Sequence, residues 1–136
     1  RQDKYMGDCI MAFWNAPIDC PDHAYKAVKT AVLIKKRLKE LNQENAFGHE
    51  IKIGIGINSG EALVGNMGSD QRFDYSVIGD AVNLASRLEG TSKNYDTTII
   101  IGEETVKRID KPKWAFRLVD KVQVKGKSEK VSIYTV

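Results

Sequence analysis

The chain has few cysteines, few histidines and no long apolar run. Cys9 and Cys20 are the two cysteines among 136 residues, and they form no Cys-x-x-Cys pair. With two scattered histidines they supply too few ligands for a structural zinc site. No apolar run approaches the ~18 residues that a membrane-spanning helix requires. Free cysteines favour a reducing compartment, so we expect a cytoplasmic location, which includes the cytosolic part of a membrane-anchored protein.

The chain also lacks a strong charge of either sign. Its formal net charge is +3, and acidic residues are interleaved with the basic ones, so we expect no nucleic-acid partner. A hydrophobic content of 42% supports one core, and 136 residues is the length of one domain, spanning 1–136. The chain begins at Arg1 without a start methionine, so we expect this domain to be incomplete at its N-terminus.

Hydrophobic periodicity predicts alternating strands and helices, and therefore an α+β fold with helices packed on a sheet. Apolar residues recur at helical spacing over 22–45, which predicts a long amphipathic helix. Shorter helices are expected at 80–89 and 103–109. Strands are expected at 4–5, 9–14, 51–58, 61–64, 73–78, 97–101, 118–124 and 131–136.

Residues 51–58 combine an aliphatic face with an almost bare one. Isoleucines at every second position alternate with Lys52, Gly54, Gly56 and Asn58. Glycine in a strand often marks the close approach of a ligand or of another backbone. We therefore expect this strand, together with the strand at 73–78, to line a binding cleft.

The segment 73–88 is the most informative part of the sequence. A strand is expected to turn at Gly79 and to continue as a helix that carries Asn83 and Arg87. Residues four apart share one helix face, so the amide and the guanidinium should point the same way. That pair suits a ribose edge and a phosphate. The alternative is an ordinary helix in which Arg87 pairs with Glu89 or another neighbour.

Several other polar residues have ordinary interpretations on their own. Asp8, in an expected hairpin turn, suits bonding to its own backbone. Lys4 can be an ordinary solvated lysine at a strand edge, and Lys125 one at a hairpin tip. Residues 126–128 read Gly-Lys-Ser, but position 121 is lysine, so the first glycine of a phosphate-binding loop is missing.

Three stretches taken together closely resemble class III nucleotidyl cyclases, the adenylyl and guanylyl cyclase catalytic domain. Residues 73–88 resemble the family signature, residues 4–13 its metal-binding hairpin, and residues 54–69 its central strand and following loop. The resemblance covers nearly the whole chain and implies a ferredoxin-like mixed or antiparallel sheet with helices packed on it. The family's first strand, which carries its first metal-binding aspartate, and two following helices have no counterpart here. We therefore expect the isolated fragment to be impaired.

The resemblance also implies roles for six residues. It assigns Asp8 to metal, Lys4 and Ser76 to the purine, Asn83 to the ribose, Arg87 to the α-phosphate and Lys125 to the terminal phosphates. A lysine at position 4 is typical of adenylyl cyclases and favours ATP. The Ser76 hydroxyl can accept from an adenine amino group or donate to a guanine carbonyl, so it discriminates between ATP and GTP less sharply than an aspartate would.

The activity that the resemblance implies is conversion of ATP to 3′,5′-cyclic AMP and pyrophosphate in signal transduction. Two divalent ions per complete site, Mg²⁺ or Mn²⁺, would assist attack of the ribose 3′-hydroxyl on the α-phosphate. The family's sites lie in a head-to-tail dimer, so we expect a homodimer, with a fused regulatory or sensor domain outside this fragment. A guanylyl cyclase and a non-catalytic nucleotide-binding or dimerisation module remain as alternatives.

Overall fold

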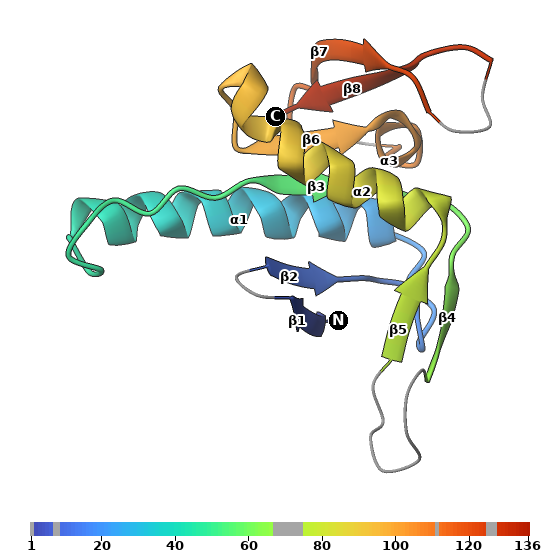
Figure 1. Ribbon diagram of the computed structural model, residues 1–136, viewed down its shortest axis with the longest axis horizontal. Helices are drawn as coiled ribbons and strands as arrows, with labels where there is room; N and C mark the ends of the chain where they lie inside the picture. The colour runs from blue at the N-terminus through green and yellow to red at the C-terminus, as the bar shows by residue number, and fades with distance from the viewer. Residues whose placement is uncertain (1, 7–8, 67–74, 111, 125–127) are drawn as a thin grey trace.

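The computed structural model describes residues 2–6, 9–66, 75–110, 112–124 and 128–136; for residues 2–6, 66 and 75–77 it describes the main chain alone. Strands and helices alternate along these residues (Figure 1). They are β1 (Gln2–Met6), β2 (Cys9–Ala12), α1 (His23–Gln43), β3 (Ile55–Ile57), β4 (Leu63–Asn66), β5 (Tyr75–Ile78), α2 (Asp80–Thr91), the 3₁₀ helix η1 (Ser92–Tyr95), β6 (Ile99–Gly102), α3 (Glu103–Lys107), β7 (Arg117–Val122) and β8 (Val131–Thr135).

A four-stranded mixed sheet with the order β3-β6-β8-β7 forms the centre of the domain. Strands β3 and β6 are parallel, and the other neighbouring pairs are antiparallel. Two antiparallel hairpins, β1-β2 and β4-β5, lie outside this sheet. The mixed sheet with packed helices confirms the expected α+β class. Among the described residues, no helix combines the length and the apolar character needed to cross a membrane.

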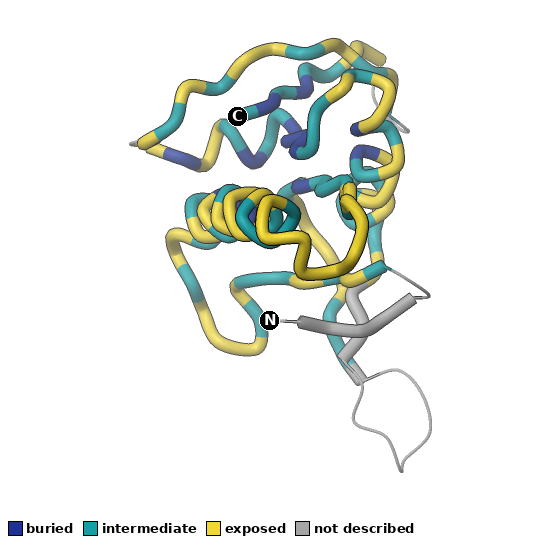
Figure 2. The backbone as a smooth tube through the Cα atoms, turned by 90° about the vertical axis from the view of Figure 1, so that its left-hand side faces the viewer, coloured by how far each residue is buried: buried dark blue, intermediate teal, exposed yellow. Residues whose placement is uncertain are grey.

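The hydrophobic core lies on both faces of β6, because successive side chains of a strand point to opposite faces. Ile99 and Ile101 are fully buried on one face with Val28 of α1. Ile100 is fully buried on the other face with Leu88 of α2. Figure 2 shows these buried segments in dark blue among segments that are exposed or half-buried. The two helices therefore cover opposite faces of the sheet.

Strand β3 is shorter than the predicted strand at 51–58. Its pairing with β6 covers Ile55–Ile57, and the Ile55 amide donates to the Thr98 carbonyl at 2.8 Å. Upstream, both main-chain groups of Ile51 bond instead to the Asn42 side chain near the end of α1, each at 2.9 Å. The prediction was therefore wrong for the first half of this segment, whose first residue bonds to a helix end and not to a neighbouring strand.

The bare face of β3 is occupied by helix α2. A Cβ atom on Gly56 would overlap the Ala85 carbonyl and the Glu89 amide, and one on Gly54 would overlap the Ser92 hydroxyl. The close approach that the glycines indicated is thus that of a helix backbone and not that of a ligand.

Replacing Gly56 with alanine is expected to lower the free energy of unfolding by about 3 kcal/mol, because the new methyl group meets backbone atoms that cannot rotate away. Gly90→Ala is the matched control. A Cβ there has no neighbour within 4 Å, so alanine should stabilise α2 by about 0.5–1 kcal/mol through helix propensity. Denaturant unfolding measures both variants, and a Gly56→Ala protein as stable as the parent would contradict the proposed packing.

Candidate functional site

A sharp turn connects β5 to α2 and sets the direction of the helix. Gly79 has φ 147°, a backbone conformation that residues with side chains rarely adopt. Its carbonyl accepts a hydrogen bond from the main-chain N–H of Asn83 at 3.0 Å. The Asn58 side-chain amide donates to the Ala81 carbonyl at 3.0 Å and joins the segment after β3 to the first turn of α2. The start of the helix is therefore fixed from two directions.

Asn83 and Arg87 lie on the outer face of α2, as the four-residue spacing predicts. Both residues are exposed, whereas Leu84 is half-buried and Leu88 is 1% exposed against the sheet. The burial of Leu88 orients the helix so that the amide and the guanidinium face solvent. This face can therefore meet a polar ligand without rearrangement of the core.

The Arg87 guanidinium is hydrogen-bonded to the residue that follows strand β7. Its Nη1 donates to the main-chain carbonyl of Gln123 at 2.7 Å, just beyond the end of β7. This bond crosses to another part of the fold, in place of the local pairing with Glu89 that the sequence also allowed. Gln123 precedes Lys125 by two positions, so Arg87 lies next to the start of the segment that carries the predicted phosphate lysine. Lys125 itself lies outside the described residues.

The main chains of the two predicted purine-reading residues belong to neighbouring strands. Lys4 lies on β1 and Ser76 on β5, and these strands contact each other. Ser76 is paired with Gly65 of β4. The side chains of Lys4 and Ser76 lie outside the described part of the structure, so their roles stay predictions.

The predicted metal-binding aspartate, Asp8, also lies outside the described residues. Strands β1 and β2 flank it as an antiparallel pair in which Met6 is opposite Cys9, so a two-residue connection that includes Asp8 joins them. This agrees with the predicted hairpin. Among the described residues, no three His, Cys, Asp or Glu side chains are grouped closely enough to hold a metal ion. The metal site therefore stays a prediction.

An open, mainly apolar hollow of about 610 Å³ lies beside the turn at Gly79. It is lined by Glu61, Ala62, Leu63, Ile78 and Gly79. Leu63 and Ile78 are cross-strand partners of the β4-β5 hairpin, and they are 65% and 45% exposed. Two of its lining residues, Ile78 and Gly79, lie in the sequence between Ser76 and Asn83, which are two of the predicted substrate-binding positions.

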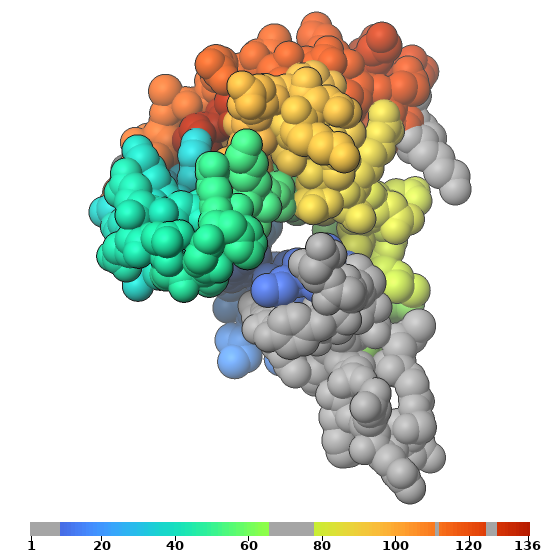
Figure 3. All heavy atoms as spheres, turned by 60° about the vertical axis from the view of Figure 1, so that its left-hand side comes forward, coloured from blue at the N-terminus to red at the C-terminus, as the bar shows by residue number. Residues whose placement is uncertain are grey.

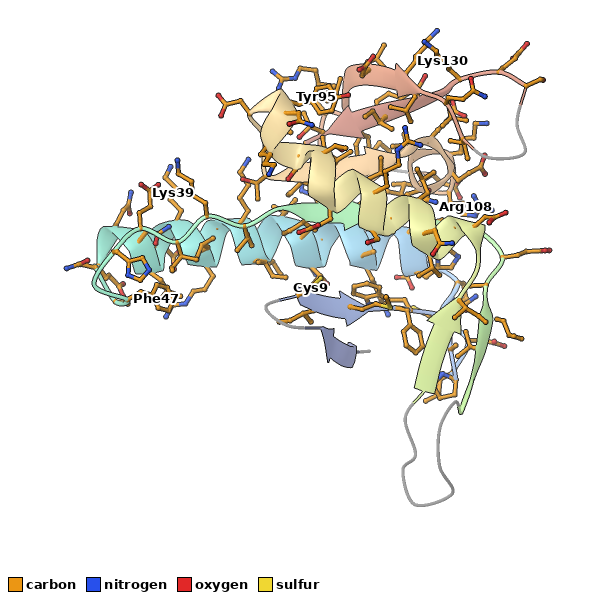
Figure 4. All side chains as sticks on the ribbon, in the orientation of Figure 1. Cys9, Lys39, Phe47, Tyr95, Arg108 and Lys130 are labelled. Carbon is orange, nitrogen blue, oxygen red and sulfur yellow. The ribbon has the colours of Figure 1, made fainter. Side chains whose placement is uncertain are left out.

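Three residues beside Arg87 had no signal in the sequence. Tyr95 of η1 donates from its hydroxyl to the Asp120 carboxylate of β7 at 2.8 Å, and Gln123 offers the carbonyl described above. Figure 4 shows Tyr95 at the end of α2, beside β7. These contacts join segments about 25 to 36 residues apart, and no local pattern of the sequence encodes such a distance.

The fold and the exposed Asn83–Arg87 pair agree with a nucleotide cyclase domain. The family model of the adenylate and guanylate cyclase catalytic domain matches residues 2–136, and the chain belongs to that family. An adenylate cyclase of Anabaena cylindrica is 43% identical over 98% of this chain, which spans 27% of the length of that relative. The terminal-differentiation-specific adenylate cyclase of Dictyostelium discoideum is 39% identical over 98% of this chain, which spans 6% of the length of that relative.

Solved cyclase structures have the same fold. The adenylyl cyclase CyaB of P. aeruginosa is 37% identical, with a TM-score of 0.79 over 98% of this chain and 69% of that one. The guanylate cyclase domain of RhGC from Catenaria anguillulae, solved with GTP, is 33% identical, with a TM-score of 0.80 over 98% of this chain and 69% of that one. The fold is thus common to cyclases of both specificities.

Proposed function

We propose that the chain is the catalytic domain of an adenylyl cyclase. In the reaction, the ribose 3′-oxygen of ATP bonds to the α-phosphorus as its proton leaves, the bond from that phosphorus to the bridging oxygen breaks, and pyrophosphate departs. The observation that carries the proposal is the exposed Asn83–Arg87 pair on α2, directly after the turn at Gly79, within a chain that matches the cyclase family over 2–136. Relatives named as adenylate cyclases at 36–43% identity support ATP as the substrate.

Arg87 is suited to the charge that develops on the α-phosphate. A guanidinium has five N–H donors and stays charged at any physiological pH. One donor is used by the Gln123 carbonyl, and the rest of the exposed group can meet phosphate oxygens. Asn83, one helical turn earlier on the same face, would hold the ribose, and Lys125 would bind the terminal phosphates. Lys4 and Ser76 would read the purine.

Class III cyclases generally depend on divalent metal ions. In this chain the Asp8 carboxylate, in the connection between β1 and β2, is the group that would hold Mg²⁺ or Mn²⁺, since these hard ions prefer oxygen ligands. Two such ions in a complete site would lower the pKa of the ribose hydroxyl and neutralise the triphosphate.

The assembly we propose is a head-to-tail homodimer with sites shared between the two copies. Asp8 would come from one copy, and Lys4, Ser76, Asn83, Arg87 and Lys125 from the other. This chain carries residues of both kinds, so two copies make two equivalent sites. The far greater length of the relatives supports a fused regulatory or sensor domain. The use of ATP would suit a cytoplasmic location, which includes the cytosolic part of a membrane-anchored protein.

Guanylyl cyclase activity is the second candidate, because the RhGC domain solved with GTP has the same fold at 33% identity. Lys4 is the residue that argues against it. Lys4→Glu should weaken cyclic AMP formation and shift the product ratio towards cyclic GMP, since a carboxylate accepts from guanine where an ammonium donates to adenine.

The experiment supplies the full-length protein with equal concentrations of ATP and GTP and with Mn²⁺, and quantifies both cyclic products. We expect cyclic AMP as the main product of the parent, and a lower ratio of cyclic AMP to cyclic GMP in Lys4→Glu. Lys52→Glu is the control, because Lys52 is exposed in the segment before β3, and it should leave the ratio unchanged. Cyclic GMP as the main product would favour the second candidate, and nucleotide binding without either product would favour a non-catalytic module.

A further inference from the structure

The helical segment formed by α2 and η1 is joined by two hydrogen bonds to β7 and to the residue that follows it. Arg87 donates to the Gln123 carbonyl at 2.7 Å, and Tyr95 donates to Asp120 at 2.8 Å. Arg87 and Tyr95 belong to one continuous helical segment, α2 followed by η1, and Asp120 and Gln123 lie three residues apart. In Figure 3 the yellow atoms of α2 and η1 lie directly against the orange and red atoms of β7 and β8.

The Asp120 carboxylate is held in a defined orientation. One of its oxygens accepts from Tyr95, and the other accepts from the Lys121 amide at 2.7 Å. Asp120 also follows an irregularity in the register of β7 and β8, between Leu118 and Asp120. Irregularities of this kind re-aim a side chain relative to the regular alternation of a strand.

The Tyr95 ring packs on the hydrophobic core. It packs against the buried cluster formed by Leu88, Ile100 and Ile133, while its hydroxyl reaches the edge of β7. A half-buried tyrosine of this kind places its hydroxyl with little rotational freedom. The hydrogen bond from η1 to β7 is therefore made by a rigid group and not by a long flexible side chain.

The electrostatics of the pair agree with a bond that persists through neutral pH. The hydrogen bond to Asp120 raises the pKa of Tyr95, and the nearby Arg87 charge opposes that rise. The hydrogen bond from Tyr95, together with the Lys121 amide and the charge of Lys130, lowers the pKa of Asp120 against the opposing effect of desolvation. The phenol therefore stays protonated and the carboxylate ionised between the two pKa values.

We propose that Tyr95 and Asp120 are positioning residues for Arg87. Their hydrogen bond holds the end of β7 against α2, which keeps the Gln123 carbonyl where it accepts from the guanidinium. The carbonyl fixes one edge of the arginine, and the remaining donors would meet the α-phosphate. This inference rests on the proposed cyclase function, because it gives Arg87 its ligand.

The test is a double-mutant cycle on the full-length protein. Tyr95→Phe keeps the ring and removes the hydroxyl, and we expect kcat to fall about tenfold with little change in KM, because a misoriented catalytic group costs up to roughly 10²-fold. In an Arg87→Ala background the same change should lower kcat less than about twofold, since there is then no arginine left to position. Tyr134→Phe is the matched control, because the described part of the chain gives its hydroxyl no hydrogen-bond partner. Equal losses in both backgrounds would overturn the proposal and leave Tyr95 a purely structural role.

A second readout does not depend on activity. The guanidinium resonances of Arg87, assigned with Arg87→Ala, should show hindered rotation in the parent and free rotation in Tyr95→Phe. If the parent makes no cyclic nucleotide, the proposed function fails, and these resonances still decide whether Tyr95 orients Arg87. Unchanged resonances in Tyr95→Phe would contradict the positioning role even in an active enzyme.

Discussion

Arg87→Ala is expected to lower kcat for cyclic AMP formation by about 10²–10³-fold, because a donor aimed at charge developing in the transition state is worth that much. KM for ATP should change far less, since the interaction strengthens as the reaction proceeds. The fold should survive the change, because the side chain is exposed and its one described bond is to a main-chain carbonyl near the surface.

The matched control for Arg87→Ala is Arg37→Ala. Arg37 is an exposed helical arginine on α1 that pairs with Glu40 of the same helix at 3.1 Å. Removal of such a surface pair should leave kcat within about twofold of the parent. Initial rates over a range of ATP concentrations separate kcat from KM for both variants. A loss in Arg87→Ala confined to KM would show that the arginine binds ATP without acting on the transition state.

Asp8→Ala is expected to reduce cyclic AMP formation by about 10³-fold or more, since metal assistance contributes several kcal/mol and each 1.36 kcal/mol is a factor of ten. Raising the concentration of Mn²⁺ should recover part of the activity if the variant retains a weakened ion site. The thermal unfolding midpoint should stay close to that of the parent, because the residue lies in a two-residue connection between β1 and β2.

Asp19→Ala is the control for the charge change. Asp19 is an exposed carboxylate in the segment between β2 and α1, and its removal should leave the rate and its Mn²⁺ dependence unchanged. Activity in Asp8→Ala that equals the parent at every Mn²⁺ concentration would remove Asp8 from the metal site.

Much of the fold can be predicted from hydrophobic periodicity alone. The long helix was expected at 22–45 and occupies His23–Gln43, and the segment 73–89 was expected to form the strand, turn and helix that the described residues contain. Both have strong periodic patterns, and Gly79 marks the turn with a conformation that only glycine adopts easily. The common face of Asn83 and Arg87 follows from helix geometry and is confirmed.

The parts that could not be predicted depend on contacts between distant segments. Gly54 and Gly56 indicated a close approach, but the sequence does not say that a helix backbone makes it. The first half of the expected strand at 51–58 is not a strand because Asn42 satisfies Ile51. The bonds from Arg87 to Gln123 and from Tyr95 to Asp120 also depend on tertiary packing, which brings two distant segments together.

The most direct test of a shared cyclase site is complementation between two inactive variants. Asp8→Ala and Arg87→Ala proteins, unfolded and refolded together in equal amounts, should form mixed dimers in which one of the two sites has both its Asp8 and its Arg87. Random pairing makes half of the dimers mixed, so the mixture should recover about a quarter of the parent rate of cyclic AMP formation. A mixture that stays as inactive as its components, while mixed dimers are demonstrated by mass, would contradict a site built from two copies of this chain.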